Sequence, residues 1–231
     1  MLDLFCGRWG WSRAFAARGW ECVGVDLVEP PEIPQGCTFW EFDILGLRLL
    51  GGELRVDGAG FDFICASPPC EQFASFGMKM FQPNPPYPDE AIRLFNHTRG
   101  LCEASRVPYI MENVRSAEAF VGNAAMRCGP FALWGNAVPT ILPQGITKAK
   151  WRSNIVHGRN APGNFAPELK LPKKQRKAIL ATIPPELANC VADYAERLLE
   201  QTHMSKSELL GSGPIPPGQC TEHESVDEKI L

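Results

Sequence analysis

Short apolar runs alternate with amphipathic segments along the first half of the chain. Five apolar runs, each followed by a turn or a carboxylate, predict β-strands, and hydrophobic positions three and four residues apart predict helices. The predicted strands are residues 2–5, 22–26, 37–42, 61–66 and 109–114, and the predicted helices are residues 11–18, 89–105 and 185–201. Strands joined by helical crossovers lie parallel. We therefore expect an α/β fold with a doubly wound, mostly parallel sheet of the Rossmann-like type.

Residues that can carry chemistry stand where the predicted strands end. Gly7 follows the first strand, Asp26 closes the second and Asp43 follows the third. Cys70 comes shortly after the fourth strand, and Glu112 lies in the last part of the fifth. Because the carboxyl ends of parallel strands meet at one edge, where doubly wound sheets bind ligands, we expect these residues to share one site.

The pattern divides the chain into four parts. Residues 1–125 are expected to form the α/β core that holds the site. Residues 126–182 have weaker periodicity and many Pro and Gly, and we expect them to finish the sheet and form a small, irregular recognition region. Residues 183–201 read as a helix that returns to the core. Residues 202–231 are polar, which predicts a disordered tail.

Charge is distributed unevenly over the 231 residues, whose net charge is −3. This total does not indicate a wholly basic nucleic-acid binder. Between residues 148 and 177, however, nine basic residues stand against a single acid, Glu168. Such a cluster is typical of a phosphate-binding surface, although a solvated loop would have the same composition. The candidate contacts in this segment are Lys148, Lys150, Arg152, Lys173, Lys174 and Arg176.

Composition also predicts the compartment. No apolar run approaches the roughly 20 residues that span a membrane, and Met1 leads into an apolar strand without a signal-peptide pattern. The nine cysteines include no CxxC pair, which favours a reducing cytoplasm without a disulfide framework or structural zinc. The four histidines are scattered and show no metal-ligand spacing, so we expect no metal site. Cys22, Cys65, Cys102 and Cys190 lie among apolar residues and are expected to be buried thiols.

Cys70 is the strongest candidate for a nucleophile. Pro68 and Pro69 end the apolar strand and stiffen the turn that presents the thiol. An isolated cysteine is more often a buried apolar residue, but a rigid turn at a strand end is suited to covalent catalysis. Glu112, which ends the neighbouring apolar run, is a candidate general acid for the same reaction.

The first turn of the chain is a candidate cofactor loop. Gly7 and Gly10 lie where the first strand meets the first helix, so that a ligand can approach the backbone there, although a tight turn alone would explain them. Asp26 is placed to bind ribose hydroxyls and Asp43 an exocyclic adenine amine, and either could instead cap a helix. No phosphate-loop sequence is present, which favours a nucleoside-like cofactor over ATP.

These segments resemble motifs of the DNA cytosine-5 methyltransferase family. Residues 2–7 with Gly10 and Ser12 are similar to its opening motif, DLFxGxGGxS, and residues 68–77 to its nucleophile loop, PPCQxFSxxG. Glu112-Asn113-Val114 is the ENV triplet, and residues 183–188 resemble the end of its last motif, NAVPPxLA. The resemblance covers about residues 1–115 and 183–195. With its short segment between the ENV triplet and the last motif, the chain resembles the compact members of the family that are often found in phages and mobile elements.

The resemblance implies a fold, a reaction and a set of roles. The fold would be that of S-adenosylmethionine-dependent methyltransferases. Cys70 would attack C6 of a cytosine flipped out of double-stranded DNA, Glu112 would act at N3, and C5 would take the methyl group. Phe5, Gly7, Gly10, Asp26, Asp43 and Pro68 would bind S-adenosylmethionine, and Asn113 would contact the substrate together with the basic residues named above. The family usually acts as a monomer, sometimes beside a cognate restriction endonuclease.

The chain departs from the family pattern at several positions. Trp9 stands in place of the first Gly of the GG pair, and Glu71 and Ala74 replace a Gln and a Ser of the nucleophile loop. Residues 181–182 replace the Asn-Ala pair of the last motif. The base-contacting QxRxR motif is missing. Arg127 is our candidate for its catalytic role, and Arg152 is a second.

Two other functions remain open at this point. The altered cofactor turn is compatible with the same scaffold using another one-carbon donor or another nucleic acid. The short segment between the ENV triplet and the last motif is compatible with a non-catalytic DNA-binding homologue. Weak binding of S-adenosylmethionine would favour the first alternative, because it would indicate another donor. The presence of both Cys70 and Glu112 argues against the second alternative, because a binding module needs neither.

Overall fold

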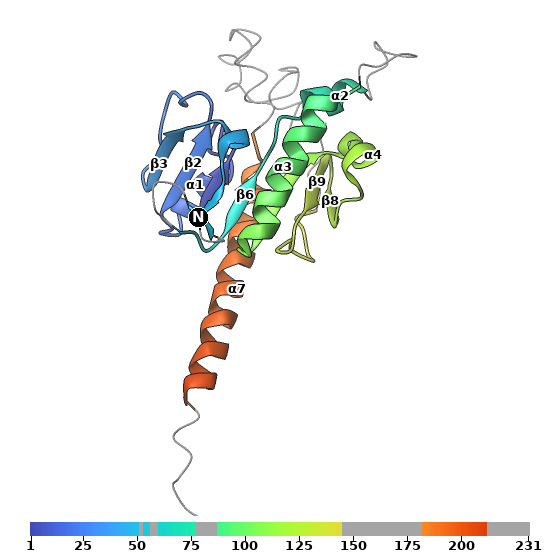
Figure 1. The fold of residues 1–231 in the computed structure, drawn as a ribbon. Coiled ribbons are helices and arrows are strands. Elements are labelled where there is room, and N and C mark those ends of the chain that lie inside the picture. Colours follow the sequence, from blue (N-terminus) through green and yellow to red (C-terminus); the bar gives the residue numbers. More distant parts are fainter. Residues whose placement is uncertain (51–52, 56–59, 77–86, 145–181, 212–231) are drawn as a thin grey trace, which may run out of the picture.

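The computed structural model describes the chain except for residues 51–52, 56–59, 77–86, 145–181 and 212–231 (Figure 1). The strands are β1 Leu2–Leu4, β2 Cys22–Asp26, β3 Cys37–Glu41, β4 Leu49–Leu50, β5 Glu53–Leu54, β6 Ile64–Ala66, β7 Tyr109–Val114, β8 Met126–Cys128 and β9 Phe131–Trp134. The helices are α1 Ser12–Ala16, α2 Glu71–Phe76, α3 Asp89–Ser105, α4 Glu118–Val121 and α7 Pro185–Gly211, with the short 3-10 helices η1 Ile44–Gly46 and η3 Arg115–Ala117.

Seven strands form one mixed sheet in the order β3-β2-β1-β6-β7-β9-β8. The strands from β3 to β7 in this order run parallel, whereas β9 is antiparallel to β7 and β8 is antiparallel to β9. The expected α/β fold with a mostly parallel sheet is confirmed. The strand order reverses between β1 and β6, and such a reversal opens a crevice at the carboxyl edge of a parallel sheet.

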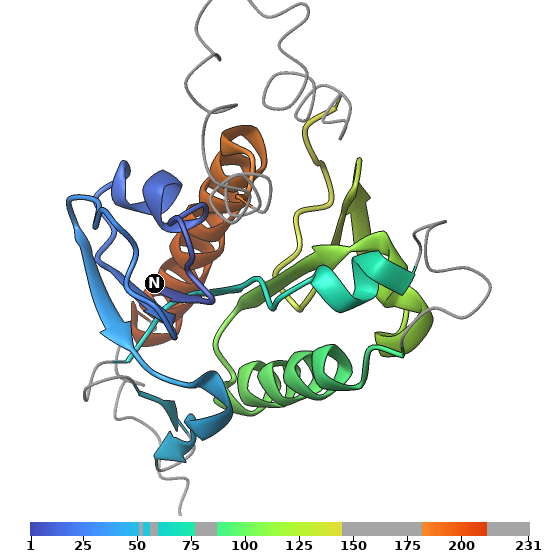
Figure 2. The same ribbon diagram turned by 90° about the horizontal axis from the view of Figure 1, so that it is seen from above.

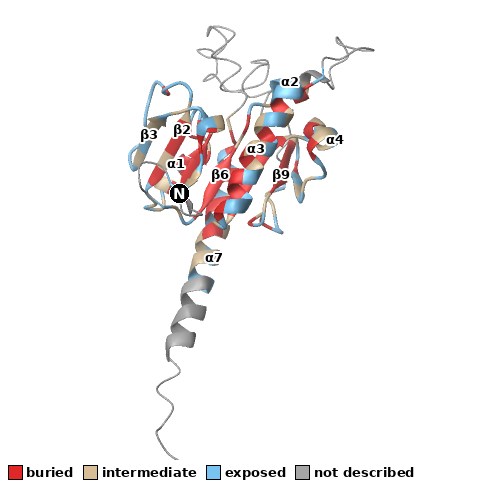
Figure 3. Ribbon diagram, in the orientation of Figure 1, coloured by how far each residue is buried: buried red, intermediate tan, exposed pale blue. Residues whose placement is uncertain are grey.

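Helices cover both faces of the sheet (Figure 2). On one face α3 contributes Phe95 and Leu101 to a cluster of buried side chains. On the other face α1 contributes Phe15, and α7 contributes Leu187 and Val191, to a second cluster. Because both faces of the sheet are covered, the inner strands β1, β6, β7 and β9 are almost fully buried, whereas the edge strands β3 and β8 are partly exposed (Figure 3). Each fully buried large side chain of this kind contributes about 1.5–3 kcal/mol to folding.

Three helix boundaries differ from the sequence-based expectations. The first helix is confined to Ser12–Ala16, and Pro88 rather than Asp89 occupies the N-cap position of α3. Asp89 lies instead in the first turn, where a carboxylate interacts favourably with the helix dipole. The last helix continues past the expected end at Gln201 to Gly211 and extends beyond the sheet in Figure 1. The expected tail therefore does not begin at residue 202, and residues 212–231 lie outside the described part.

The strands show smaller differences. The fourth predicted strand begins at Ile64 rather than at Phe61, and the antiparallel pair β4–β5 was not expected. The sheet ends with the antiparallel strands β8 and β9, within the region that was expected to finish it. Within the described ranges, no helix combines the length and apolar character that crossing a membrane requires.

Candidate functional site

The turn after β1 is held in an unusual backbone conformation. Phe5, Gly7 and Trp9 all have positive φ angles, of 62°, 47° and 63°. The Gly7 N–H donates to Asp26 Oδ2 at 3.0 Å, and the Leu27 N–H donates to Asp26 Oδ1 at 2.7 Å. Asp26 therefore ties the first turn to the end of β2. Because each carboxylate oxygen has a second lone pair, Asp26 keeps acceptor capacity for a ligand.

Trp9 is buried beneath this turn. Its side chain is fully buried, and its ring meets Phe39 of β3 edge-on at a centroid distance of 6.3 Å. The ring lies against Gly24 of β2 so closely that a Cβ added there would be 2.2 Å from Trp9 Cζ3. The absent side chain of Gly24 makes room for the Trp9 indole.

Asp3 is the most deeply buried carboxyl group near the site. Ser12 Oγ donates to Asp3 Oδ2 at 2.6 Å, while Asp3 Oδ1 has no hydrogen-bond partner among the described residues. Burial raises the pKa of Asp3 to about 7, against the lowering effect of the Ser12 hydrogen bonds. Asp3 therefore fixes the start of α1, and its carboxyl group keeps its proton to a higher pH than an ordinary aspartate does.

Residues 67–70, which we call the nucleophile turn after the candidate nucleophile Cys70, leave β6 beside the turn that follows β1. Ser67 accepts a hydrogen bond from Trp11 Nε1 at 2.9 Å and donates its backbone N–H to the Leu4 carbonyl at 3.1 Å. Cys70 is half-buried, and its carbonyl accepts the Ala74 N–H at 2.8 Å as α2 begins. The first turn and the nucleophile turn therefore meet across β1 and β6, where the strand order reverses.

Asn113 joins the nucleophile turn to β7. Its Nδ2 donates to the Pro68 carbonyl at 2.9 Å, and its Oδ1 accepts the Val114 N–H at 2.9 Å. The side chain is fully buried. It therefore links the nucleophile turn to β7, and the substrate contact expected for Asn113 stays a prediction. Glu112, the preceding residue of β7, is itself buried, and its side chain projects from the opposite face of the sheet.

The helix that begins at the nucleophile turn is anchored from two sides. Ser116 Oγ donates to the Phe73 carbonyl at 2.7 Å, and Gln72 Oε1 accepts the Ala91 N–H at 2.9 Å. Phe73 is fully buried and packs edge-on against Phe95 of α3. These contacts fix α2, and with it the position of Cys70.

Gly10 contacts the segment before α7. A Cβ at this position would lie 2.8 Å from the Ile183 backbone nitrogen, so a larger residue would force the two segments apart. The structure thus brings the last predicted motif against the first loop. Gly10 is explained by this close approach of Ile183.

The region beside Asp26 contains further candidates. Leu27 and Val28 are apolar yet 61% and 70% exposed, and they directly follow Asp26 at the carboxyl edge. Asp43 caps η1, since its Oδ1 accepts the Leu45 N–H at 3.0 Å, which matches the capping alternative left open by the sequence. His97 Nε2 lies 3.0 Å from the Ile44 carbonyl and joins α3 to η1.

Arg127 lies away from the junction. It forms hydrogen bonds to Glu118 Oε1 at 3.1 and 3.0 Å. Burial alone would raise the pKa of Glu118, but the hydrogen bonds that the carboxylate accepts, with those from Arg127 foremost, lower it. Arg127 is in register with Ala132, which is in register with Asn113. Because side chains alternate along strands, Arg127 and Glu112 project from opposite faces of the sheet. The structure does not bring Arg127 to Cys70 and Glu112.

The expected basic contacts cannot be compared with this geometry. Lys148, Lys150, Arg152, Lys173, Lys174 and Arg176 all lie outside the described residues. Among the residues that are described, no group of three or more His, Cys, Asp or Glu side chains is arranged to hold a metal ion.

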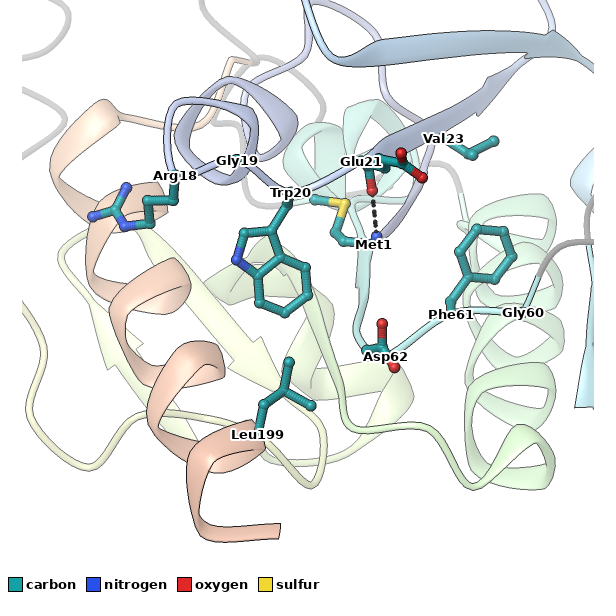
Figure 4. Close-up of a pocket in the computed structure, with 10 residues that line it drawn as sticks. All are labelled: Met1, Arg18, Gly19, Trp20, Glu21, Val23, Gly60, Phe61, Asp62 and Leu199. Atoms are coloured by element: carbon teal, nitrogen blue, oxygen red, sulfur yellow. Dashed lines mark hydrogen bonds between the residues drawn. The ribbon is translucent and has the colours of Figure 1, made fainter. Parts of the chain in front are cut away.

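A cavity of about 480 Å³ lies at the opposite edge of the sheet (Figure 4). Met1, Glu21 and Asp62, which line it, precede β1, β2 and β6, so it opens at the amino ends of these strands. Trp20 and Phe61 contribute aromatic walls. The cavity is therefore separate from the junction that holds Cys70 and Glu112.

Sequence reasoning missed the residues that join the segments. Trp11, Ser67 and Ser116 supply the hydrogen bonds between the turns, and Gly24 supplies the space for Trp9. Only Trp11 and Ser67 carried a signal, because they adjoin recognised motifs. Comparison of the chain with protein-family models and with curated proteins finds no match, so its function has to be argued from the site.

Proposed function

We propose that the protein is a DNA cytosine-5 methyltransferase, which transfers a methyl group from S-adenosylmethionine to C5 of a cytosine. The junction at the carboxyl edge of the sheet carries the proposal. There Trp11, in the first motif-like segment, donates to Ser67 at the nucleophile turn, and Asn113 of the ENV triplet donates to Pro68. The segments that resemble the family motifs are thus joined by direct hydrogen bonds at the carboxyl edge of the sheet, which supports the proposal.

Cys70 and Glu112 divide the chemistry in this proposal. C5 of cytosine is a poor nucleophile until a thiolate adds to C6 and converts the ring to an enamine. Cys70 forms that bond while Glu112 donates a hydrogen bond or a proton to N3. C5 then bonds to the methyl carbon as the carbon–sulfur bond of the donor breaks. Transfer of the C5 proton to water, departure of Cys70 as a thiolate and return to Glu112 of any proton given to N3 restore the aromatic ring.

Several residues fit S-adenosylmethionine, which supplies an electrophilic methyl carbon when bound. Asp26 has acceptor capacity for ribose hydroxyls after accepting the Gly7 and Leu27 N–H groups. The exposed side chains of Leu27 and Val28 offer an apolar surface to a purine ring. Trp9 packs beneath the turn rather than across it, which supports the usual donor despite the altered sequence.

Duplex DNA is the proposed substrate. A cytosine within a duplex has to leave the base stack before a thiol can reach C6. The basic segment between residues 148 and 177 supplies the charge that would bind the phosphate backbone.

Analysis of methylated nucleosides tests the proposed reaction. Duplex DNA of mixed sequence is incubated with the protein and methyl-labelled S-adenosylmethionine, digested, and separated into nucleosides. We expect label in 5-methylcytosine for the wild type and for the control Cys190→Ala, which alters another half-buried thiol, and none for Cys70→Ala. Label in N4-methylcytosine or N6-methyladenine would contradict the proposal, as would transfer by Cys70→Ala.

A further inference from the structure

Cys22 and Cys37 form a pair of thiols across two neighbouring strands. They are direct partners in the parallel register of β2 and β3, so both side chains project from the same face of the sheet. The two thiols interact directly, since each shifts the pKa of the other. Cys22 is buried beneath α1 and Cys37 is half-buried at the edge strand of the sheet.

The two thiols differ in reactivity. The hydrogen bond from Cys22 lowers the pKa of Cys37, and the positive charge of Arg13 acts in the same direction. The same hydrogen bond, together with burial, raises the pKa of Cys22. Because the thiolate is the reactive form and Cys37 is the more exposed thiol of the pair, Cys37 is the one that an oxidant would attack first.

Cys37 is the thiol of the pair that solvent can reach, because it is half-buried whereas Cys22 is buried. A cavity of about 530 Å³ opens between α1 and the turn before β3, with Gly36, the residue before Cys37, in its lining. Arg13, which pairs with Glu32 at 3.2 Å, also lines this cavity.

We propose that Cys22 and Cys37 are a thiol-oxidation site that a hydroperoxide converts to a reversible disulfide between β2 and β3. Cys37 Sγ attacks a peroxide oxygen, which gives a sulfenic acid and releases water from hydrogen peroxide. Cys22 Sγ then attacks the Cys37 sulfur, and the hydroxyl group leaves with the Cys22 proton as a second water. The two thiols are oxidised and the peroxide is reduced, with no other reactant.

The strand geometry makes this disulfide labile. Directly paired residues of adjacent strands have Cα atoms about 4.8 Å apart, which lies within the range for disulfides of about 4.4–6.8 Å. Their Cβ atoms must approach to about 3.8 Å, closer than the strand spacing allows without local movement. Strained disulfides of this kind are readily reduced, which is the behaviour of regulatory rather than structural bonds.

Peptide mapping under non-reducing conditions tests the site. The folded Cys70→Ala variant, which removes the candidate catalytic thiol, is treated with one equivalent of hydrogen peroxide, and the remaining thiols are alkylated before digestion. We expect a mass loss of two hydrogen atoms, a linked pair of peptides containing Cys22 and Cys37, and complete recovery with dithiothreitol. The control Cys190→Ala, in the same background, should give the same linked pair.

The Cys22→Ser variant separates the two steps. Without the resolving thiol, Cys37 should accumulate a sulfenic acid, which dimedone traps with the expected mass. The proposal is overturned if peroxide oxidises other cysteines of the folded protein while Cys22 and Cys37 stay reduced, or if the linked pair forms only after unfolding in urea. It is also overturned if dimedone labels Cys22 rather than Cys37 when each is tested in the other's serine variant.

Discussion

A single amide side chain connects the two residues to which we assign the chemistry. Asn113 follows Glu112 on β7 and donates to the carbonyl of Pro68, which lies shortly before Cys70. Both polar atoms of the buried amide are used, because its oxygen accepts the Val114 N–H. At the residue scale, the position of the nucleophile turn therefore depends on Asn113.

Asn113→Ala should destabilise the protein and reduce methyl transfer. The substitution leaves the Pro68 carbonyl without its donor in a buried setting, which costs about 1–3 kcal/mol. Urea unfolding measures the stability, and turnover at saturating cofactor measures the effect on the turn. Asn123→Ala, which alters an exposed asparagine, serves as the control and should change neither. Wild-type turnover by Asn113→Ala would refute the positioning role.

Asp3 should make stability depend on pH. Its pKa rises from 3.8 to about 7 in the folded protein, so the folded state retains a proton that the unfolded state loses between these values. The contribution of Asp3 to the free energy of unfolding is largest below about pH 4, decreases as the pH rises, and is lost above about pH 7. Urea unfolding between pH 4.5 and 7.5 should show a weaker decline for Asp3→Asn. Identical slopes for both proteins would rule out this account of Asp3.

At the scale of elements, α1 and α7 are held together by Arg18. Its guanidinium donates to the Ala14 carbonyl at 2.8 Å and to Asn189 Oδ1 at 2.7 Å, and it also pairs with Asp193. The contact matters for the site because α7 begins just after Ile183, the residue that packs against Gly10. Arg18→Ala should lower the free energy of unfolding by about 1–2 kcal/mol, because it removes several charge-assisted hydrogen bonds.

Arg13→Ala is the matched control for Arg18→Ala. Arg13 pairs only with the exposed Glu32, at 3.2 Å among the described residues, and an exposed pair contributes less than about 1 kcal/mol. Equal effects of the two substitutions in urea unfolding would contradict the role of Arg18 in joining the helices.

β2 and the first turn depend on each other through Gly24. Gly24→Ala should destabilise the protein by about 1–3 kcal/mol, because the new Cβ would overlap the Trp9 ring. Gly100→Ala is the control, since a Cβ there meets nothing within 4 Å and alanine favours a helix. Thermal unfolding of the two variants should shift in opposite directions. A neutral Gly24→Ala would mean that Trp9 moves freely.

The sequence predicted some elements to the residue and others only approximately. Tyr109–Val114 and Asp89–Ser105 match the structure because a continuous apolar run and a long amphipathic pattern are strong local signals. The strand start at Ile64 depends on pairing with β1 and β7, which local pattern does not encode. The same is true of the site: the candidates at strand ends were visible, whereas Trp9 against Gly24 and Asn113 against Pro68 are contacts distant in sequence.

In the proposed function, methyl transfer takes place at the carboxyl edge of the sheet and the basic segment between residues 148 and 177 binds DNA. Neutralising Lys173, Lys174, Arg176 and Lys177 together should weaken DNA binding and reduce its dependence on salt, because each lost phosphate contact lowers the slope by about 0.9. Binding of S-adenosylmethionine, measured by calorimetry, should stay unchanged. Fluorescence titrations over a range of salt concentrations test this, and an unchanged slope would mean that these residues do not contact phosphate.

Covalent trapping on DNA is the decisive test of whether Cys70 adds to C6 of a cytosine. Fluorine at C5 cannot leave as a proton does, so an enzyme that adds Cys70 to 5-fluorocytosine stays bound to its target. Duplexes containing 5-fluorocytosine are incubated with S-adenosylmethionine and the protein, and the adduct is digested for peptide mapping. The account predicts a denaturant-resistant complex joined through Cys70 and absent from Cys70→Ala. A complex through another residue, or methyl transfer to ordinary cytosine without trapping, would contradict it.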